Sequence, residues 1–292
     1  MNKVVFFLMG KKGLFCLKSL SNVQLEFVHA VVFANDKNVA NDYVEEIKEF
    51  CAKNKLQLFS RLQWEAEKTD FEGYAIAISW RWLINNSNIK LIVLHDSLLP
   101  KYRGFNPLVT ALINGDNKIG VTALIANKEF DRGDIIGQSS IEVKYPIKIE
   151  QAIDAIIPCY VNLVQDIFNH LKQGDLTSVV QDESQATYSL WRDEEDYLIH
   201  WEKDAKVIER EVNALGYPYS GARTKMDGKD IIILEAIALD DIFIENRTPG
   251  KIMFMQENQP EVVCGKGLLK IQTATSIDGK KINFSKFRQR FK

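Results

Sequence analysis

The chain has 292 residues, of which 46% are hydrophobic and 26% are charged, with a formal net charge of −2 and a pI of about 6.2. These values describe an ordinary globular protein that is long enough for one large and one small domain. They exclude a strongly basic surface of the kind that holds a polyanion by counterion release, so we expect no nucleic-acid partner.

The cysteines and the apolar runs indicate the compartment. The four cysteines are widely separated and form no CxxC pair, so neither a metal site nor a disulfide framework is expected; they are Cys16, Cys51, Cys159 and Cys264. The short apolar run at the N-terminus is followed by lysines and lacks a small-residue cleavage site. No apolar run approaches the roughly 18 residues of a membrane span. We expect a cytoplasmic protein that does not insert into a membrane.

Apolar strands alternate with helical segments over the first half of the chain. Gly10-Lys11-Lys12-Gly13 reads as a turn that leads from the first strand into a helix at 14–20. This alternation predicts the α/β class, with a mostly parallel, Rossmann-like sheet covered by helices on both faces. The predicted strands are 3–8, 27–33, a short one near Leu58, 74–79, 90–94, 119–126 and 135–143, and an amphipathic helix is predicted at about 41–55.

The second half of the chain predicts a smaller domain. A helix at about 149–172 is followed by residues rich in Gly, Asp, Ser and Thr. After a further helix at 204–215, short alternating segments with turn residues between them indicate a small antiparallel β-barrel. We therefore expect an α/β domain at 1–187, a linker at 188–204 and the barrel domain at 205–292.

The strand at 90–94 leads directly into His95-Asp96-Ser97. The carboxyl end of a strand in an open α/β sheet is where ligand chemistry is usually found. His is the side chain most easily used as a proton donor or acceptor near neutral pH, and a carboxylate usually orients it. His29, His170 and His200 lie in an apolar strand, at a helix end and in a charged segment, which favours structural or surface roles for them. His95 is therefore the candidate catalytic histidine.

Three segments in order carry a family resemblance: HDSLLPKYRG at 95–104, GVT at 120–122 and DRGDII at 131–136. They resemble the signature of the folate-dependent formyltransferases, and the separation of His95 and Asp131 agrees with that of the family. PGKI at 249–252, VVCGKGLLKI at 262–271 and DGKK at 278–281 resemble the small OB-like barrel that follows the catalytic domain in many members. The resemblance implies a formyltransferase fold, with the catalytic domain at 1–187, and formyl transfer from N10-formyltetrahydrofolate to an amine.

The resemblance also implies roles for His95 and Asp131. His95 would donate to the developing oxyanion, and Asp131 would hold His95 or a bridging water and accept the proton. Asp131 has an alternative reading, since Asp-Arg-Gly is an ordinary turn sequence. One position departs from the family, because Val93 stands where an Asn is usual two residues before the His. Ser97 is a candidate substitute for the missing donor, although a serine after a strand is also a common cap.

Binding residues follow from the resemblance as well. The folate pocket would be made by backbone groups of Arg81-Trp82-Leu83 and of the loop before Asp131, which contains Asn127, Lys128, Glu129 and Phe130. The alternative for the first segment is the start of a core helix whose tryptophans pack. Gly10, Lys11, Lys12 and Gly13 would receive the phosphates of the acceptor at a helix start, and the alternative is a solvated turn.

Three acceptors are consistent with the family: a nucleotide-linked amino sugar, methionyl-tRNA and glycinamide ribonucleotide. The second domain counts against the last one. Methionyl-tRNA enzymes carry a basic loop after the second strand, whereas residues 34–50 here are acidic. This acidity favours a small anionic acceptor. YSLWRDEEDYLIHW at 188–201 and ALGYPYSGA at 214–222 also resemble the sugar formyltransferases, which implies a nucleotide-linked 4-amino-deoxy sugar as acceptor, used for surface glycans such as lipopolysaccharide. Trp191, Tyr217 and Tyr219 are candidates to stack on the base, with interface packing as the alternative.

Two other functions and one assembly stay open at this point. Because Val93 replaces the family Asn, the chain could be a catalytically impaired binding homologue, and a folate hydrolase is a further alternative. Retention of His95, Asp131 and the loop SLLPKYRG favours an enzyme. The C-terminal antiparallel strands could pair across a homodimer.

Overall fold

The computed structural model describes residues 3–67, 71–84 and 88–292, which fold into two compact units. The N-terminal unit comprises Met1–Leu108, Lys118–Glu142 and Ile153–Leu190, and the C-terminal unit comprises Val109–Asn117, Val143–Ala152 and Trp191–Lys292. The main division falls after Leu190, within the linker that we expected at 188–204. Two short segments, 109–117 and 143–152, cluster with the C-terminal unit although composition does not mark them.

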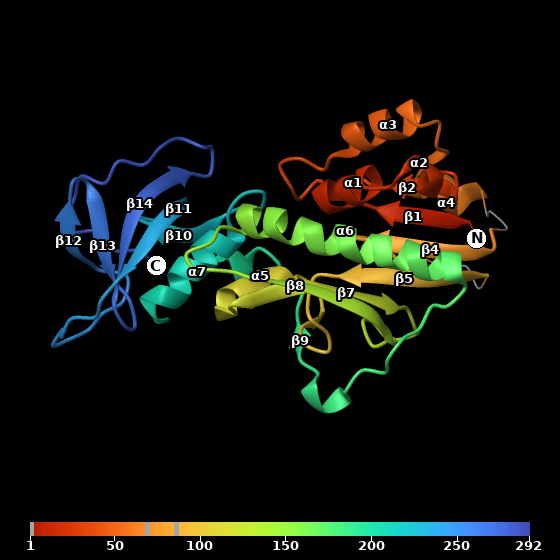
Figure 1. Ribbon diagram of the computed structural model, residues 1–292. Coiled ribbons are helices and arrows are strands. Elements are labelled where there is room, and N and C mark those ends of the chain that lie inside the picture. The colour runs from red at the N-terminus through yellow and green to blue at the C-terminus, as the bar shows by residue number, and fades with distance from the viewer. Residues whose placement is uncertain (1–2, 68–70, 85–87) are drawn as a thin grey trace. The chain divides into compact units, whose positions relative to one another are not determined.

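A seven-stranded sheet forms the centre of the N-terminal unit (Figure 1). Its strands are hydrogen-bonded in the order β3-β2-β1-β4-β5-β7-β8. The first five are parallel, whereas β7 and β8 run antiparallel to their neighbours. The prediction of a mostly parallel α/β sheet is confirmed. The bounds are β1 Val4–Leu8, β2 Val28–Phe33, β3 Leu58–Ser60, β4 Gly73–Ile78, β5 Ile89–His95, β7 Lys118–Ile125 and β8 Ile135–Glu142.

Helices cover both faces of this sheet because its strands are apolar on both sides. All five residues of β1 are buried, and alternate side chains point to opposite faces. Phe6 stacks on Phe168 of α6 (Ile149–Gln173) with ring centroids 6.2 Å apart, while Phe7 meets Trp64 of α4 (Arg61–Glu67) edge to face at 5.5 Å. The other helices up to residue 190 are α1 Gly10–Lys18, α2 Asn22–Leu25, α3 Val44–Lys53 and α5 Pro107–Asn114. Across the described part of the chain, no helix has the length and apolar character needed to cross a membrane.

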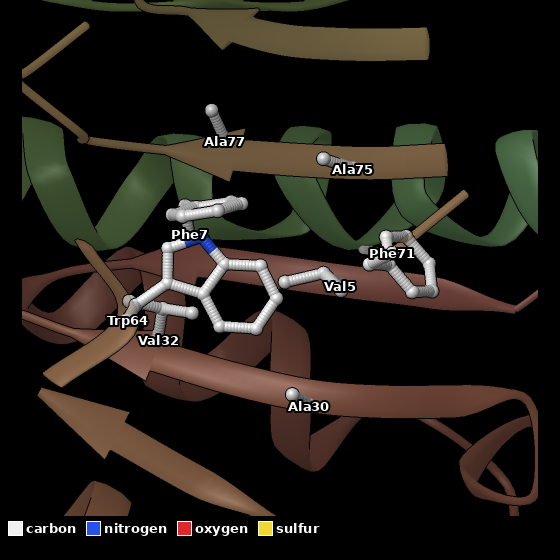
Figure 2. Packing of buried hydrophobic residues seen from close by; sticks show 8 residues of the cluster. All are labelled: Val5, Phe7, Ala30, Val32, Trp64, Phe71, Ala75 and Ala77. Carbon is white, nitrogen blue, oxygen red and sulfur yellow. The ribbon is translucent and has the colours of Figure 1, made fainter. Parts of the chain in front are cut away.

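Figure 2 shows the apolar cluster on the α4 face of the sheet. The rings of Phe7 and Trp64 lie over strands that carry short residues here, among them Ala30, Ala75 and Ala77. Interiors are packed as densely as organic crystals, so small side chains on the strands match the large rings. The cluster continues along β5 through the partly buried side chains of Ile89, Leu91 and Val93.

The strand order reverses between β1 and β4, which is the topological switch point of the sheet. Ligands of open α/β sheets bind outside the carboxyl ends of the strands at such a point. Residues 9–13 follow β1, residues 79–83 follow β4, and β5 ends at His95. The fold therefore brings these predicted strand-end residues to one edge of the sheet.

A short ladder returns the chain to this edge after α6. β6 (Arg103–Gly104) pairs in parallel with β9 (Tyr188–Ser189), and the 3-10 helix η1 (Glu183–Gln185) precedes β9. Tyr188 and Ser189, which we expected in the linker, thus form part of the N-terminal unit.

The C-terminal unit contains a five-stranded antiparallel sheet in the order β10-β11-β14-β13-β12, together with α7 (Ala205–Leu215). Asp204 begins α7, because its carboxylate accepts the N–H of Lys206 at 2.9 Å. A second 3-10 helix, η2 (Glu195–Tyr197), precedes α7. The strand bounds are β10 Ala222–Met226, β11 Lys229–Leu239, β12 Ile252–Gln256, β13 Gln259–Val263 and β14 Leu268–Ser276.

The small antiparallel domain is confirmed, but its closure differs from the barrel that we expected. β10 and β12 stand at the two edges of the sheet. Over residues 191–292, which the structure describes in full, these edges do not pair directly; the last residues link them. Phe291 bridges to Met226 of β10, and Arg290 bridges to Lys251, just before β12. The expected barrel is therefore an open sheet whose edges are joined by the end of the chain.

We expect Phe7→Ala to lower the free energy of unfolding by about 3–5 kcal/mol, because it removes a ring buried between α4 and the sheet. Leu62→Ala is the matched control on α4, since that side chain is 66% exposed, and it should change stability by less than about 0.5 kcal/mol. Urea unfolding followed by tryptophan fluorescence measures both. Equal unfolding midpoints for the two variants would contradict the packing described here.

Candidate active site

His95 ends β5 and is held by a backbone carbonyl. Its ring is 8% exposed, and Nε2 lies 2.8 Å from the carbonyl oxygen of Tyr102. A carbonyl oxygen can only accept, so Nε2 must carry the hydrogen of this bond. The other ring nitrogen, Nδ1, lies 3.5 Å from Oδ1 of Asp131. In the neutral ring Nδ1 is therefore the atom with a free lone pair, and it faces a carboxylate.

Asp131 lies in the loop between β7 and β8 in an uncommon backbone conformation. Its φ is 57°, a left-handed region that costs a residue other than glycine about 1 kcal/mol or more. Its second carboxylate oxygen, Oδ2, accepts the N–H of Gly104 at 2.9 Å. The turn passes very close to β7, because a Cβ on Gly133 would lie 1.6 Å from the carbonyl oxygen of Ile125. The structure thus brings together His95 and Asp131, whose catalytic roles stay a prediction.

The segment Tyr102-Arg103-Gly104 contacts both members of the pair. Hydrogen bonds hold the backbone of this segment to β9 and to Thr187, the residue before β9. The N–H groups of Tyr102 and Arg103 donate to the side chain and the carbonyl of Thr187, both at 2.9 Å, and Phe105 N–H donates to Ser189 at 3.1 Å. In the sequence, only the match to the family motif marks this segment.

A buried cation lies within this segment. Arg103 is 1% exposed, and its guanidinium binds both carboxylate oxygens of Glu183 at 2.9 Å. Glu183 also accepts from Arg132 at 3.0 Å. Hydrogen bonds from Arg103, and then from Arg132, lower the pKa of Glu183 to about 2. Because this pKa is depressed, the ionised Glu183 stabilises the folded protein fully at pH values above its ordinary pKa of 4.5. That stabilisation is lost only as the pH falls toward about 2.

Thr122 fixes the loop after His95. It is fully buried; its hydroxyl donates to the carbonyl of Ser97 at 2.6 Å and accepts from Leu99 N–H at 3.0 Å. Gln138 donates to the same hydroxyl at 2.9 Å and to the carbonyl of Leu99 at 2.7 Å. The Ser97 hydroxyl donates to the carbonyl of Lys101 at 2.7 Å, so its hydrogen is used within the loop. A capping serine would instead accept a backbone N–H, so this bond is not that of a helix cap, and the role of Ser97 in catalysis stays a prediction.

Val93 lies two residues before His95, on the same face of β5. Its side chain is partly buried against the apolar cluster of Figure 2. In the sheet it pairs with Ala77 on β4 and Leu124 on β7. At the position where the family usually has an Asn, the neighbouring side chains on both adjacent strands are therefore apolar.

The first loop differs from the turn that we expected. α1 begins at Gly10, so Lys11, Lys12 and Gly13 lie in its first turns. The helix approaches the strand closely, because a Cβ on Gly13 would lie 2.8 Å from Cβ of Leu8. Glycine at position 13 therefore lets the helix pack closely on the strand, whereas the sequence predicts that it serves a turn.

Both lysines of this loop have carboxylate partners. Lys11 pairs with Asp154, and Lys12 pairs with Asp96, the residue after His95. Asp96 also accepts the hydroxyl of Tyr160 on α6. Burial, and then the charge of Asp96, raise the pKa of Tyr160 well above its ordinary value, so this phenol stays protonated and donates. Asp96 therefore ties α1, β5 and α6 together.

Each of the two candidate folate loops has an exposed apolar side chain. Leu83 is 69% exposed and Phe130 is 70% exposed. Arg81 pairs with Asp36 at 2.5 Å, and Trp82 lies under Arg61, with the guanidinium carbon 4.9 Å from the ring centroid. Residues 79–84 form no helix, so the alternative of a core helix start is wrong, although Trp80 does pack on Phe7.

The loop at 127–130 is held locally. Asn127 accepts the N–H of Glu129 at 2.9 Å, and Glu129 pairs with Arg132. Lys128, which stands between Asn127 and Glu129 in the sequence, is exposed. The loop starts beside β5, because Ala126 N–H donates to the carbonyl of Leu91 at 2.9 Å.

The three aromatic candidates for base stacking belong to the C-terminal unit. Trp191 and Tyr217 are exposed and Tyr219 is partly buried. Their roles stay predictions. The described residues contain no group of three or more His, Cys, Asp or Glu side chains that could hold a metal ion.

Comparison with known proteins gives matches in both halves of the chain. The formyl transferase family model matches residues 73–156, and that of the formyl transferase C-terminal domain matches residues 192–292. The methionyl-tRNA formyltransferase of Thermotoga neapolitana is 30% identical over 195 residues, which cover 67% of this chain and 61% of that protein. That of Streptococcus sanguinis is 32% identical over 179 residues, covering 61% and 56%. The chain thus spans about three-fifths of the length of these curated relatives.

Solved structures share the fold over nearly the whole chain. The sugar 3N-formyl transferase WlaRD has a TM-score of 0.69 at 16% identity and covers 97% of this chain and 98% of its own. An N-formyltransferase from Helicobacter canadensis has a TM-score of 0.67 at 15% identity, with coverage of 97% and 100%. HypX from Aquifex aeolicus has a TM-score of 0.60 at 18% identity and covers 94% of this chain and 44% of its own. With two family models that together match more than half of its residues, the chain belongs to the formyl transferase family.

Proposed function

We propose that this protein transfers a formyl group from N10-formyltetrahydrofolate to the amino group of a nucleotide-linked 4-amino-deoxy sugar. One observation carries the proposal: His95 and Asp131, inside the segment that the formyl transferase model matches, face each other at the carboxyl edge of the sheet. Among the fold relatives, WlaRD was solved with dTDP and 5-N-formyl-THF, and the Helicobacter protein with folinic acid and dTDP-3-aminofucose.

The side chains support a donor of the folate type. The loops that follow β4 and β7 each carry an exposed apolar side chain, Leu83 and Phe130, which can pack against a flat ring system. The indole Nε1 of Trp80 is buried and has no hydrogen-bond partner among the described residues, so it is an unused donor beside the first of these loops. When bound, the donor supplies the formyl carbon that the amine attacks.

The geometry supports distinct tasks for the two members of the pair. Nε2 of His95 is committed to Tyr102, so Nδ1 is the nitrogen that can donate to the developing oxyanion once it is protonated. Asp131 would then stabilise the imidazolium, accept the proton that the new ammonium releases and pass it to the leaving nitrogen of the donor as the bond between that nitrogen and the formyl carbon breaks. Gly104 N–H keeps one carboxylate oxygen occupied and leaves the other facing His95.

Charge favours a small anionic acceptor over a tRNA. The loop between β2 and α3 carries Asp36 and Asp42 against Lys37, and α3 begins with Glu45 and Glu46. A tRNA would need phosphate-binding cations, and the chain carries a net charge of −2. Methionyl-tRNA is nevertheless the second candidate, because the curated sequence relatives at 30–32% identity are methionyl-tRNA formyltransferases.

One series of incubations separates these functions. The protein is mixed with formyl-labelled N10-formyltetrahydrofolate and, in turn, with dTDP-, UDP- and GDP-linked 3-amino and 4-amino sugars and with methionyl-tRNA. We expect a formamido sugar from a 4-amino substrate. Formyl-methionyl-tRNA would favour the second candidate, free formate a hydrolase, and unchanged donor with every acceptor an impaired binding homologue.

His95→Gln should lower kcat for formyl transfer by at least about 100-fold while folate binding persists, because the ring is assigned to proton handling. His200→Gln, an exposed histidine in the C-terminal unit, is the control and should leave kcat unchanged. Steady-state kinetics and calorimetric folate titration measure both. Turnover of His95→Gln at the wild-type rate would remove the assignment.

Replacing Lys11 and Lys12 by Gln should raise KM for the acceptor more than KM for the donor, if the start of α1 receives phosphate. The effect should shrink at about 1 M salt, where charges are screened beyond about 3 Å. Lys18→Gln, at the other end of α1, is the control. Equal changes in the two KM values would mean that these lysines serve only their ion pairs with Asp154 and Asp96 and bind no acceptor phosphate.

Val93→Asn should raise kcat, by up to about 100-fold, if a missing oxyanion donor limits the rate. The amide would meet apolar neighbours, so we also expect a loss of about 1–3 kcal/mol in the free energy of unfolding. Val93→Leu is the control for packing.

A folded Val93→Asn variant with the wild-type kcat would instead point to another donor. Ser97→Ala then decides. A loss of about tenfold or more in kcat at constant KM would assign the donor to Ser97, and an unchanged kcat would leave His95 and Asp131 as a sufficient pair.

A further inference from the structure

Gln181 is a buried side chain that connects the two halves of the proposed active site. It lies between α6 and η1, and only 5% of its surface is exposed. Its carboxamide oxygen accepts from Arg103, at 3.1 Å from Nε and 2.8 Å from Nη2. Its amide nitrogen donates to the carbonyls of Asp131 and Gly133, each at 2.8 Å. One side chain thus joins the segment after β5 to the turn that carries Asp131.

The orientation of this amide is determined by its partners. Arg103 can only donate and the two carbonyls can only accept, so the oxygen must face Arg103 and the nitrogen must face the turn. Both hydrogens of the nitrogen are used, one on each carbonyl. Arg103 is itself fixed by Glu183, whose pairing keeps the guanidinium from turning away. The connection therefore has a single arrangement.

The two residues next to Arg103 hold the pair directly. Tyr102 binds His95 through its carbonyl, and Gly104 binds Asp131 through its N–H. Gln181 closes the loop of contacts, since it holds the backbone of Asp131 from the other side. Without Gln181, the carbonyl of Asp131 would lose this hydrogen bond. The left-handed backbone of Asp131 would then be free to relax, and its carboxylate would move away from His95.

We propose that Gln181 is a positioning residue of the formyl transfer site, which acts through Arg103 and the Asp131 turn and touches no substrate. The inference rests on the proposed function for its effect on catalysis. The contacts that carry it lie within the N-terminal unit.

Two variants of Gln181 test the proposal. Gln181→Met keeps the length of the side chain and removes both connections. Gln181→Glu keeps oxygen acceptors for Arg103 and turns a carboxylate oxygen toward the two carbonyls, so it stays informative if the first variant does not fold. Gln165→Met is the matched control, because Gln165 on α6 makes the same kind of bridge, donating to the carbonyl of Ser19 at 3.0 Å and accepting from Gln24 at 2.6 Å.

The kinetic expectation is a change in kcat and not in affinity. In either Gln181 variant kcat should fall about 10- to 100-fold, the effect of displacing a catalytic group by roughly 1 Å. KM for donor and acceptor should change by less than about threefold, because no substrate contact is removed. Gln165→Met should keep both parameters. A Gln181 variant with the wild-type kcat, or with KM raised as much as kcat is lowered, would overturn the positioning role.

Amide hydrogen exchange tests the same contact without formyl transfer. Gly104 N–H is bound to the Asp131 carboxylate, whereas the N–H groups of Arg103 and Phe105 are bound to backbone carbonyls at 187 and 189. In the Gln181 variants we expect exchange at Gly104 to be at least about tenfold faster, with Arg103 and Phe105 unchanged. Acceleration at all three amides, or at none, would overturn the proposal. If the wild-type protein transferred no formyl group, this measurement would still decide whether Gln181 positions Asp131.

Discussion

Tyr102 and Gly104 are separated by one residue, yet their backbone groups hold the two members of the proposed catalytic pair, since the carbonyl of the first binds His95 and the N–H of the second binds Asp131. The distance between the histidine and the carboxylate therefore depends on the path of a three-residue segment and not on the side chains alone. That path is set by hydrogen bonds to residues 187–189, more than 80 positions later in the chain. The segment after α6 thus takes part in building the site.

Charges around this site are mostly paired in advance. Lys11, Lys12 and Arg103 each have a carboxylate partner, and the pKa of Glu183 is held at about 2 by Arg103 and Arg132. A protein cation that is already paired binds a ligand phosphate with less gain, because the existing pair must be weakened. An acceptor phosphate at α1 would therefore compete with Asp154 and Asp96, which is a reason for an acceptor with compact, concentrated charge such as a nucleotide diphosphate.

Much of the fold could be predicted because it follows from periodic patterns. Apolar strands alternate with helices up to β4, and β5 is a further apolar run; this pattern predicts a parallel sheet and the strand-end position of His95. Asp131 had no such pattern and was found by its resemblance to a family motif. Gln181, Thr122 and Gln138 carry no sign of their roles in the sequence, because a single side chain that bonds to a distant backbone leaves no periodic signal.

Two local expectations differ from the structure. The sequence predicts a turn at Gly10, where α1 begins, since a glycine in a sequence looks the same whether it serves a turn or a close helix contact. The open sheet joined by Arg290 and Phe291 was read as a barrel for a related reason, as strand alternation does not reveal how edges meet.

The proposed chemistry depends most on which ring nitrogen of His95 carries the hydrogen. Its four histidines make the chain well suited to nitrogen NMR with labelled histidine, and His95→Gln assigns the signal of interest. At a pH where the ring is neutral, we predict a protonated Nε2, bound to Tyr102, and a bare Nδ1 facing Asp131. A neutral ring with the hydrogen on Nδ1 would contradict this orientation, and with it the assignment of Nδ1 as the atom that serves the developing oxyanion.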